Sequence, residues 1–239
     1  MKNLDRNKMV GVIFFGPQGS GKGTQAKLLA DKFDFFHFDS GGYLRKILYD
    51  PKLQKNKIIR RERRLNEAGK LNSELWVTKI VNQRFKELID LGQSIVTEGF
   101  PRTLFETFGD KKTKGAIDIF EKGYGRNNIF IFVLNIPEKE SIKRTTQRFI
   151  CSICKAPLLS PKLLRLGRIK FKICPFCGGK IVHRVDDNRE TIITRLKEYK
   201  QRTQPIFKEL KKRKYKIYRI DGTPMPAEIH QKIIAKIFK

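Results

Sequence analysis

The chain carries a glycine-rich loop at residues 16–24, with the sequence Gly-Pro-Gln-Gly-Ser-Gly-Lys-Gly-Thr. The apolar run Val10–Phe15 precedes this loop, and Lys27–Phe33 follows it with a helical pattern. Glycines let successive backbone N–H groups turn toward phosphate oxygens, the following helix presents its positive N-terminal end, and Lys22 adds a charge near the outer phosphates. The pattern therefore predicts a strand, a phosphate-binding loop and a helix that together bind a nucleoside triphosphate.

One position of the loop departs from the commonest pattern. Gly23 follows Lys22, where a serine or threonine hydroxyl usually ligates magnesium, and Thr24 comes one place late for that task. We therefore expect another group of the chain to help hold the metal.

Five apolar, β-branched or aromatic runs bounded by turn signals predict strands, and helical patterns lie between them. Such alternation predicts an α/β fold with a mostly parallel sheet, helices on both faces, and ligands at the carboxyl ends of the strands. Residues 109–125, rich in glycine and lysine, are interpreted as a surface insertion. The predicted strands are Val10–Phe15, Phe35–Phe38, Ser94–Thr97, Ile129–Asn135 and Tyr215–Ile220.

The length and composition fit a globular chain. With 239 residues, 39% apolar content and 18 phenylalanines, the chain can bury one α/β core with an inserted subdomain. The longest apolar runs, such as Ile129–Leu134, are far shorter than a membrane span, and the N-terminal residues lack the apolar core of a signal peptide. We therefore expect a cytoplasmic protein without a membrane partner.

The formal net charge of +28 is extreme, because 52 lysines and arginines face 24 acidic residues. A charge of this size attracts polyanions non-specifically. Two interpretations stay open: a basic surface that is simply solvated, or a surface that contacts RNA or ribosomes.

Four cysteines form two C-x-x-C pairs, separated by residues 155–173. Two such pairs are typical of a four-cysteine zinc site, where tetrahedral thiolate coordination leaves no open position and the metal has a structural role. An iron cluster is the alternative metal centre. The predicted ligands are Cys151, Cys154, Cys174 and Cys177.

Several separated motifs, in this order, resemble those of the adenylate kinases and of the nucleoside monophosphate kinases of that fold. The resemblance covers nearly the whole chain and includes the kind of adenylate kinase that has zinc in its lid. The motifs that carry it are residues 16–24 with Gln25 and Ala26; Ser40 and Gly41 with Tyr43, Leu44 and Arg45; Gly69, Lys70 and Leu71; Gly99, Phe100, Pro101, Arg102 and Thr103; and Arg184 with Asp186, Asp187 and Arg195.

The resemblance implies a P-loop kinase core with a five-stranded, mostly parallel sheet. The core is expected at residues 1–39, 74–149 and 188–239, a helical monophosphate-binding arm at 40–73, and a small zinc-bearing lid at 150–187. In the family both the arm and the lid close over the substrates, which excludes water from the phosphoryl donor. The family also implies a monomer.

By the same resemblance, phosphoryl transfer relies on positioning and positive charge and needs no protein nucleophile. Arginines suit the task, because the planar guanidinium makes two charge-assisted bonds to a phosphate. The catalytic residues implied are Lys22, Arg102, Arg148, Arg184 and Arg195. Those implied for ATP are Gly19, Ser20, Gly21, Lys22, Gly23, Thr24, Arg148, Pro157, Leu158 and Pro224. Those implied for the monophosphate are Ser40, Arg45, Lys70, Leu71, Asn72, Gly99, Phe100, Pro101, Arg102, Glu106, Arg184 and Arg195.

Two positions near the magnesium differ from the family pattern. Glu98 stands where the family has an aspartate that orients the magnesium water shell, and Gly42 replaces a second aspartate. The longer Glu98 side chain can compensate, because magnesium keeps several waters and accepts an outer-sphere carboxylate. Asp39 is interpreted as a residue that closes a turn.

Glu106 stands where the family usually has a glutamine that both accepts from and donates to adenine. An ionised carboxylate cannot donate, whereas guanine offers it two adjacent donors. AMP remains the expected acceptor, and a preference for guanylate is the alternative.

Lid residues just after the first cysteine pair touch the donor base in the family, often through a tyrosine. Pro157 and Leu158 occupy those places here, which weakens stacking on adenine. His183 is interpreted as lid packing or surface, and the carbonyl near Thr223 and Pro224 can receive the adenine amino group.

These observations predict reversible phosphoryl transfer from MgATP to a nucleoside monophosphate, most simply AMP, with a structural zinc. Two alternatives stay open. One is a guanylate-preferring or broad-specificity kinase, and the other is a nucleotide-regulated factor that associates with RNA or ribosomes.

Overall fold

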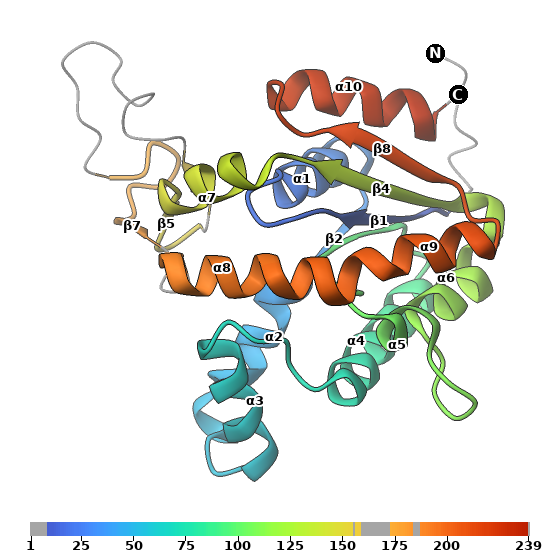
Figure 1. Cartoon of the computed structure of the whole chain (residues 1–239), viewed down its shortest axis with the longest axis horizontal. Helices are drawn as coiled ribbons and strands as arrows, with labels where there is room; N and C mark the ends of the chain where they lie inside the picture. The colour runs from blue at the N-terminus through green and yellow to red at the C-terminus, as the bar shows by residue number, and fades with distance from the viewer. Residues whose placement is uncertain (1–8, 155, 159–172, 184–186, 239) are drawn as a thin grey trace.

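The computed structural model describes residues 9–154, 156–158, 173–183 and 187–238. A five-stranded parallel sheet with the order β2-β3-β1-β4-β8 forms its centre (Figure 1). The predicted α/β class is confirmed, and each strand lies within two residues of its predicted bounds. The strands are β1 (Gly11–Phe15), β2 (Phe36–Asp39), β3 (Ile95–Glu98), β4 (Ile129–Asn135) and β8 (Ile217–Asp221).

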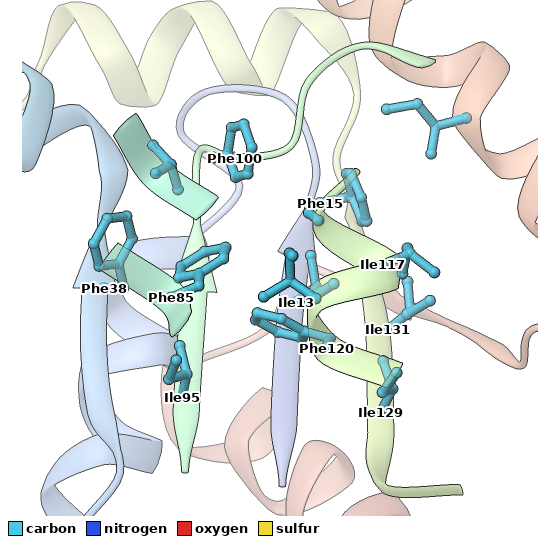
Figure 2. Close-up of a cluster of buried hydrophobic side chains, with 14 of the residues drawn as sticks. Ile13, Phe15, Phe38, Phe85, Ile95, Phe100, Ile117, Phe120, Ile129 and Ile131 are labelled. Atoms are coloured by element: carbon cyan, nitrogen blue, oxygen red, sulfur yellow. The ribbon is translucent and has the colours of Figure 1, made fainter. Parts of the chain in front are cut away.

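Helices cover both faces of the sheet. One face packs against α4 (Glu74–Asp90), α5 (Leu104–Phe108), α6 (Ala116–Tyr124) and α9 (Gln204–Lys212). The cluster on this face includes Phe38, Phe85, Phe100 and Phe120, and Figure 2 shows their rings among branched aliphatic side chains. The other face packs against α1 (Lys22–Phe33) and α10 (Pro226–Ile237).

The interpretation of residues 109–125 as a surface insertion was wrong. Gly109 and Lys114 pair across a short turn, and α6 follows with Ala116, Ile117, Ile119 and Phe120 buried. These apolar side chains recur at helical spacing, a signal that outweighs the local content of glycine and lysine. The helix approaches β1 so closely that a Cβ on Gly11 would lie 2.6 Å from the Phe120 ring.

Two smaller structures project from the sheet (Figure 1). The first consists of α2 (Ser40–Leu48), η1 (Pro51–Leu53) and α3 (Lys57–Glu67). The second is an antiparallel sheet with the order β6-β5-β7, formed by β5 (Phe149–Cys151), β6 (Pro157–Leu158) and β7 (Ile181–His183).

The remaining helices connect these parts. η2 (Arg126–Asn128) leads into β4, and α7 (Glu138–Thr146) leads from β4 to β5. α8 (Arg189–Glu198) continues through the π-helical turn η3 (Tyr199–Thr203) into α9, and Figure 1 shows them as one long helix. In the described part of the chain, no helix has the length and apolar character needed to span a bilayer.

Candidate active site

The glycine-rich loop joins the carboxyl end of β1 to α1, as predicted. Gly19 and Gly21 have φ angles of 74° and 91°, in the region that favours glycine. A Cβ on Gly16 would lie 2.4 Å from the carbonyl oxygen of Leu134, so the loop also passes too close to β4 for a side chain. These glycines allow the backbone to curl at the end of the strand.

The N-terminus of α1 lies at the end of this loop. Its N-cap residue is Gly21, and no side chain of the described residues caps it. Uncapped N–H groups at a helix N-terminus carry partial positive charge and bind anions. The loop therefore has the backbone donors that a phosphate requires.

Lys22 is the first residue of α1, and its ammonium lies over the loop. Its Nζ donates to the carbonyl oxygens of Gly16 and Pro17 at 2.8 and 2.7 Å. Burial lowers the pKa of Lys22 to about 8, with Arg102 and Arg148 adding to the effect and Glu98 opposing it. The ammonium is thus held in a desolvated position beside two guanidinium groups.

The predicted cations converge on one region. The pKa of Arg102 is lowered mainly by burial and then by the positive charge of Arg195, with a smaller contribution from Arg45. Like charges repel when buried together, so such a cluster favours an anionic partner. The structure brings together Lys22, Arg45, Arg102, Arg148 and Arg195. Of the other two predicted cations, Arg184 lies outside the described residues, and Lys70 is exposed after α3.

Arg148 is positioned by Asp187. The guanidinium donates to both carboxylate oxygens of Asp187, at 2.8 and 2.5 Å, and the Asp187 side chain is almost fully buried. This bidentate pair joins the residues just before β5 to those just before α8. Sequence reasoning had assigned Asp187 no role, because a pairing across so many intervening residues leaves no local pattern.

The carboxyl end of β3 places Glu98 beside the phosphate loop. A Cβ on Gly23 would lie 3.4 Å from Oε1 of Glu98, so Gly23 leaves room for this carboxylate. Ser40 donates its hydroxyl to the Glu98 carbonyl at 2.8 Å, and Arg102 donates to the Gly99 carbonyl at 2.6 Å. The side chains of Ser40 and Arg102 therefore hold the backbone carbonyls of Glu98 and Gly99 at this strand end.

Asp39 is the N-cap of α2. Its carboxylate accepts from the backbone N–H of Gly42 at 3.0 Å and lies 3.9 Å from Arg45. The interpretation of Asp39 as a turn-closing residue is confirmed.

The segment after α3 is held by Glu62, a residue that sequence reasoning did not single out. Its side chain is fully buried and accepts from the backbone N–H of Ser73 at 2.8 Å, from the Ser73 hydroxyl at 2.5 Å, and from Arg61 at 2.8 Å. Asn72 donates to the Glu62 carbonyl and carboxylate, so its side chain faces the interior of this segment. Of the neighbouring predicted residues, Lys70 is exposed and Leu71 is half-buried.

Glu62→Gln should destabilise this segment by about 2–4 kcal/mol, because several donors would lose a buried charged acceptor. Burial tends to raise the pKa of Glu62, but hydrogen bonds from Ser73, Arg61 and Asn72 outweigh it and lower the pKa. The stabilisation is therefore present above the ordinary glutamate pKa and lost as pH falls through the lowered value. Urea unfolding of parent and variant between neutral and acidic pH measures both effects.

Glu67→Gln is the matched control, because Glu67 lies on the same helix, pairs with Arg63 and is about half exposed. Its expected cost is within about 1 kcal/mol. Equal losses for the two variants would show that Glu62 is not the anchor.

Glu106 is buried and serves as a local acceptor. Its Oε2 accepts from the backbone N–H of Arg102 at 2.6 Å, while the Glu106 N–H donates to the Thr103 hydroxyl at 3.2 Å. The Thr103 bond is that of a capping box, whose T-x-x-E pattern is visible in the sequence, but the carboxylate accepts from Arg102, one residue before the N-cap. Burial raises the pKa of Glu106 to about 7, an effect that Glu74 supports and that Arg102 and Arg202 oppose.

The four cysteines come together on the small antiparallel sheet. Their sulfur atoms all lie within 4.8 Å of one another, and the Cys151–Cys177 and Cys154–Cys174 pairs are 3.3 and 3.8 Å apart. A tetrahedral site with Zn–S bonds of about 2.3 Å separates its sulfurs by about 3.8 Å. The donor set and its spacing fit a four-thiolate metal site.

The other predicted residues of this small sheet divide into interior and surface. Leu158 is buried in a cluster with Cys151 and Cys174, whereas Pro157 is exposed. His183 is exposed and its ring lies 3.9 Å from that of Phe149. The interpretation of His183 as packing or surface is confirmed.

Arg144, on α7, holds the turn after β8. Its guanidinium donates to the carbonyls of Gly222 and Thr223 at 2.8 and 3.1 Å, next to the predicted Pro224. Asp221 accepts from the Thr223 N–H at 2.9 Å and closes the same turn. Nothing in the sequence around Arg144 indicated this contact.

The helix α8 contacts both the loop and the segment after α3. Gln18 donates to the Ile192 carbonyl at 2.8 Å. Gly69 lies so close that an added Cβ would be 2.7 Å from the Thr191 methyl group. Arg195 is on the same helix, so α8 connects the phosphate loop, the cation cluster and the segment after α3.

Comparison with known proteins identifies the family. The adenylate kinase family model matches residues 14–215. Adenylate kinase of Clostridium tetani is 30% identical and covers 93% of this chain and 95% of its own length. Adenylate kinase of Borreliella burgdorferi is 31% identical and covers 96% of this chain and 99% of its own length. Adenylate kinase of Archaeoglobus fulgidus is 30% identical and covers 89% of this chain and 90% of its own length.

These matches extend over the sheet, the phosphate loop and the converging cations. The chain therefore belongs to the adenylate kinase family and is a nucleoside monophosphate kinase.

Proposed function

We propose that the enzyme catalyses reversible transfer of the outer phosphoryl group of MgATP to AMP, giving two ADP. The convergence of Lys22, Arg45, Arg102, Arg148 and Arg195 at the carboxyl end of the sheet is the observation that carries this proposal. In the transition state the transferred phosphoryl group spreads its negative charge over several oxygens. Fixed cations in a desolvated site stabilise that charge.

In this scheme the loop N–H groups and Lys22 hold the donor phosphates, and Arg148 is aimed at them by Asp187. Arg45 and Arg102 hold the acceptor monophosphate, while Arg195 bridges the two. Residues 40–73 act as the arm that carries the acceptor, and residues 150–187 act as the lid that carries Arg184. The acceptor phosphate is itself the nucleophile, so these side chains orient the reactants and exclude water.

Two metals complete the proposal. Magnesium, which neutralises phosphate charge when it is bound with ATP, would have its water shell oriented by Glu98 beside Gly23. A structural zinc would be held by Cys151, Cys154, Cys174 and Cys177. Such a zinc would have no open position for substrate, and its direct contribution would be to the folding of the small sheet.

Glu106 supports AMP over GMP as the acceptor. Bidentate recognition of guanine requires an ionised carboxylate with both oxygens free, yet one oxygen accepts from Arg102 and burial favours the neutral acid. A neutral carboxyl group, like the amide of glutamine, can both accept and donate, which is the pattern that adenine requires.

The acceptor is tested by incubating the enzyme with MgATP and, separately, AMP, GMP, CMP and UMP, and measuring diphosphate formation. We expect transfer to AMP to exceed transfer to GMP by orders of magnitude. A preference for GMP would contradict the assignment and make Glu106 the determinant of guanine specificity. Light scattering on the same sample tests the predicted monomer.

Glu106→Gln should retain transfer to AMP and raise stability at alkaline pH. The folded-state pKa of Glu106 is above its ordinary value, so its contribution to stability is lost as pH rises through about 7. The glutamine side chain still accepts from the Arg102 N–H but carries no buried charge. Above that pH the free energy of unfolding should therefore rise by up to about 3 kcal/mol. Thermal unfolding from pH 5 to pH 9 measures it.

Glu190→Gln, at an exposed position of α8, is the control for this substitution. Its unfolding should show the same pH profile as the parent. The burial argument fails if Glu106→Gln also follows the parent profile.

A further inference from the structure

A second concave site lies between the π-helical turn η3, α9 and the edge of the sheet. It is a cavity of about 480 Å³. Its walls come from Tyr199 and Gln204 on the helical side, from Asn135 at the end of β4 and from Arg219 in the middle of β8. It shares no lining residue with loop 16–24.

The helix opens at this point for a local reason. Pro205 follows Gln204 at the start of α9 and has no backbone N–H, so the regular hydrogen-bond ladder cannot continue through it. The preceding turn widens to the π form over Tyr199–Thr203. Tyr199 and Gln204 stand at the two ends of this turn.

Three cations surround the cavity. Lys208 and Lys211 lie three residues apart on α9 and so share a helix face, and Arg219 reaches in from β8 with its guanidinium over the Phe207 ring, 5.3 Å from the ring centroid. None of the described lining residues is acidic.

Nearby carboxylates are committed to other cations. Glu209 pairs with Arg213 at 2.8 Å, and Glu138 pairs with Lys200 at 2.5 Å. Within the described part of the chain, Lys208, Lys211 and Arg219 form no ion pair. The cavity therefore concentrates positive charge that has no internal partner.

The positive charge continues beyond the cavity. Lys212 at the end of α9, and Lys214 and Lys216 on the turn that leads to β8, are all exposed. A small anion would need only the cavity, whereas a row of cations of this length fits an extended polyanion. Burial raises the pKa of Tyr199 to about 12, with Arg219 opposing the shift, so the phenol stays protonated and can donate to a phosphate or a ribose hydroxyl.

We propose that this surface, from the η3–α9 cavity along the α9–β8 turn, binds the sugar-phosphate backbone of single-stranded RNA. A flexible single strand can turn a phosphate into the cavity, whereas a duplex holds its phosphates on a regular outer surface. The inference goes beyond the kinase activity and uses none of its proposed residues.

The test measures binding of a fluorescent oligouridylate of about 20 nucleotides by anisotropy across a salt series. The cavity variant is Lys208→Gln/Lys211→Gln, and the control is Lys79→Gln/Lys86→Gln, which removes the same charge from exposed positions of α4. We expect the cavity variant to bind at least about five-fold more weakly at near-physiological salt, and its salt slope to fall by about 1.4, at about 0.7 for each phosphate contact. The control should stay close to the parent.

Equal weakening in both double variants would overturn the proposal, because it would show that only overall charge attracts the RNA. Full displacement of the RNA by tripolyphosphate at an equal phosphate concentration would overturn it too, and would assign the cavity to a free oligophosphate. Phosphoryl transfer to AMP is measured on the same samples and should be unchanged in all of them. That readout separates this proposal from the proposed kinase reaction.

Discussion

Lys22→Ala should reduce phosphoryl transfer by about 100- to 1,000-fold, the usual loss when one preorganised charge donor is removed from a transition state. Lys22 is placed by α1 at the mouth of the phosphate loop, where its ammonium lies beside Arg102 and Arg148. Arginines from other elements cannot replace it, because they approach the site from β5, from the β3–α5 connection and from α8. Steady-state rates with MgATP and AMP measure the loss.

The same substitution should leave the fold intact. Burial holds the pKa of Lys22 at about 8, below its ordinary value of 10.5, so keeping the folded-state ammonium charged costs free energy at neutral pH. The substitution removes the ammonium and with it that cost. This gain offsets the loss of the hydrogen bonds from Lys22 to the Gly16 and Pro17 carbonyls. The melting temperature at pH 7 should therefore not fall by more than a few degrees.

Lys27→Ala is the control, because Lys27 lies on the same helix, is exposed and pairs with Asp31 at 2.9 Å. It should keep the parent rate. Transfer by Lys22→Ala within about ten-fold of the parent would contradict the role given to Lys22, and a large drop in its melting temperature would contradict the account of the buried ammonium.

The sheet and the loop could be predicted because their signals are local. A parallel strand buried on both faces reads as a continuous apolar run, and a phosphate loop reads as glycines at fixed places between a strand and a helix. The same reasoning failed for α6, where glycine and lysine content was given more weight than the periodic Ala116, Ile117, Ile119 and Phe120.

The supporting contacts of the site could not be predicted in the same way. Asp187 meets Arg148, and Arg144 meets the turn after β8, only because the chain folds back on itself. Glu62 stands among arginines in the sequence, where a solvated helix face is the natural interpretation, yet it is fully buried. The T-x-x-E pattern that ends at Glu106 was readable, but the residue had been interpreted through its expected contact with a base.

The metal site should have the second largest effect. We expect the purified protein to contain one zinc per chain, and Cys174→Ser to lose most of it, because Cys174 is buried and is one of the four clustered thiolates. Structural zinc sites provide much of the folding free energy of small sheets, which have little apolar core of their own. Among the described residues, Leu158 is the one further buried residue of the cluster that packs with Cys151 and Cys174.

Loss of the metal should also affect the active site, because the metal-binding sheet is covalently connected to Arg148 through β5. Arg148 lies immediately before β5, and β5 carries Cys151, so unfolding of the small sheet would release the end of the strand that positions Arg148. We therefore expect Cys174→Ser, or chelation of the parent, to lower phosphoryl transfer at least about ten-fold and to raise amide exchange in β5 and β7 while β1 and β4 stay protected.

Ile153→Ala is the matched control, because it changes an exposed side chain between Cys151 and Cys154 and leaves all four thiolates in place. It should keep both the metal and the activity. Metal content and amide hydrogen exchange are measured on the same samples. If the metal-free protein kept its β5 and β7 amides protected, zinc would not be needed to fold the small sheet. A protein that loses zinc and the protection of these strands but transfers phosphate at the parent rate would instead show that Arg148 does not depend on β5 for its position.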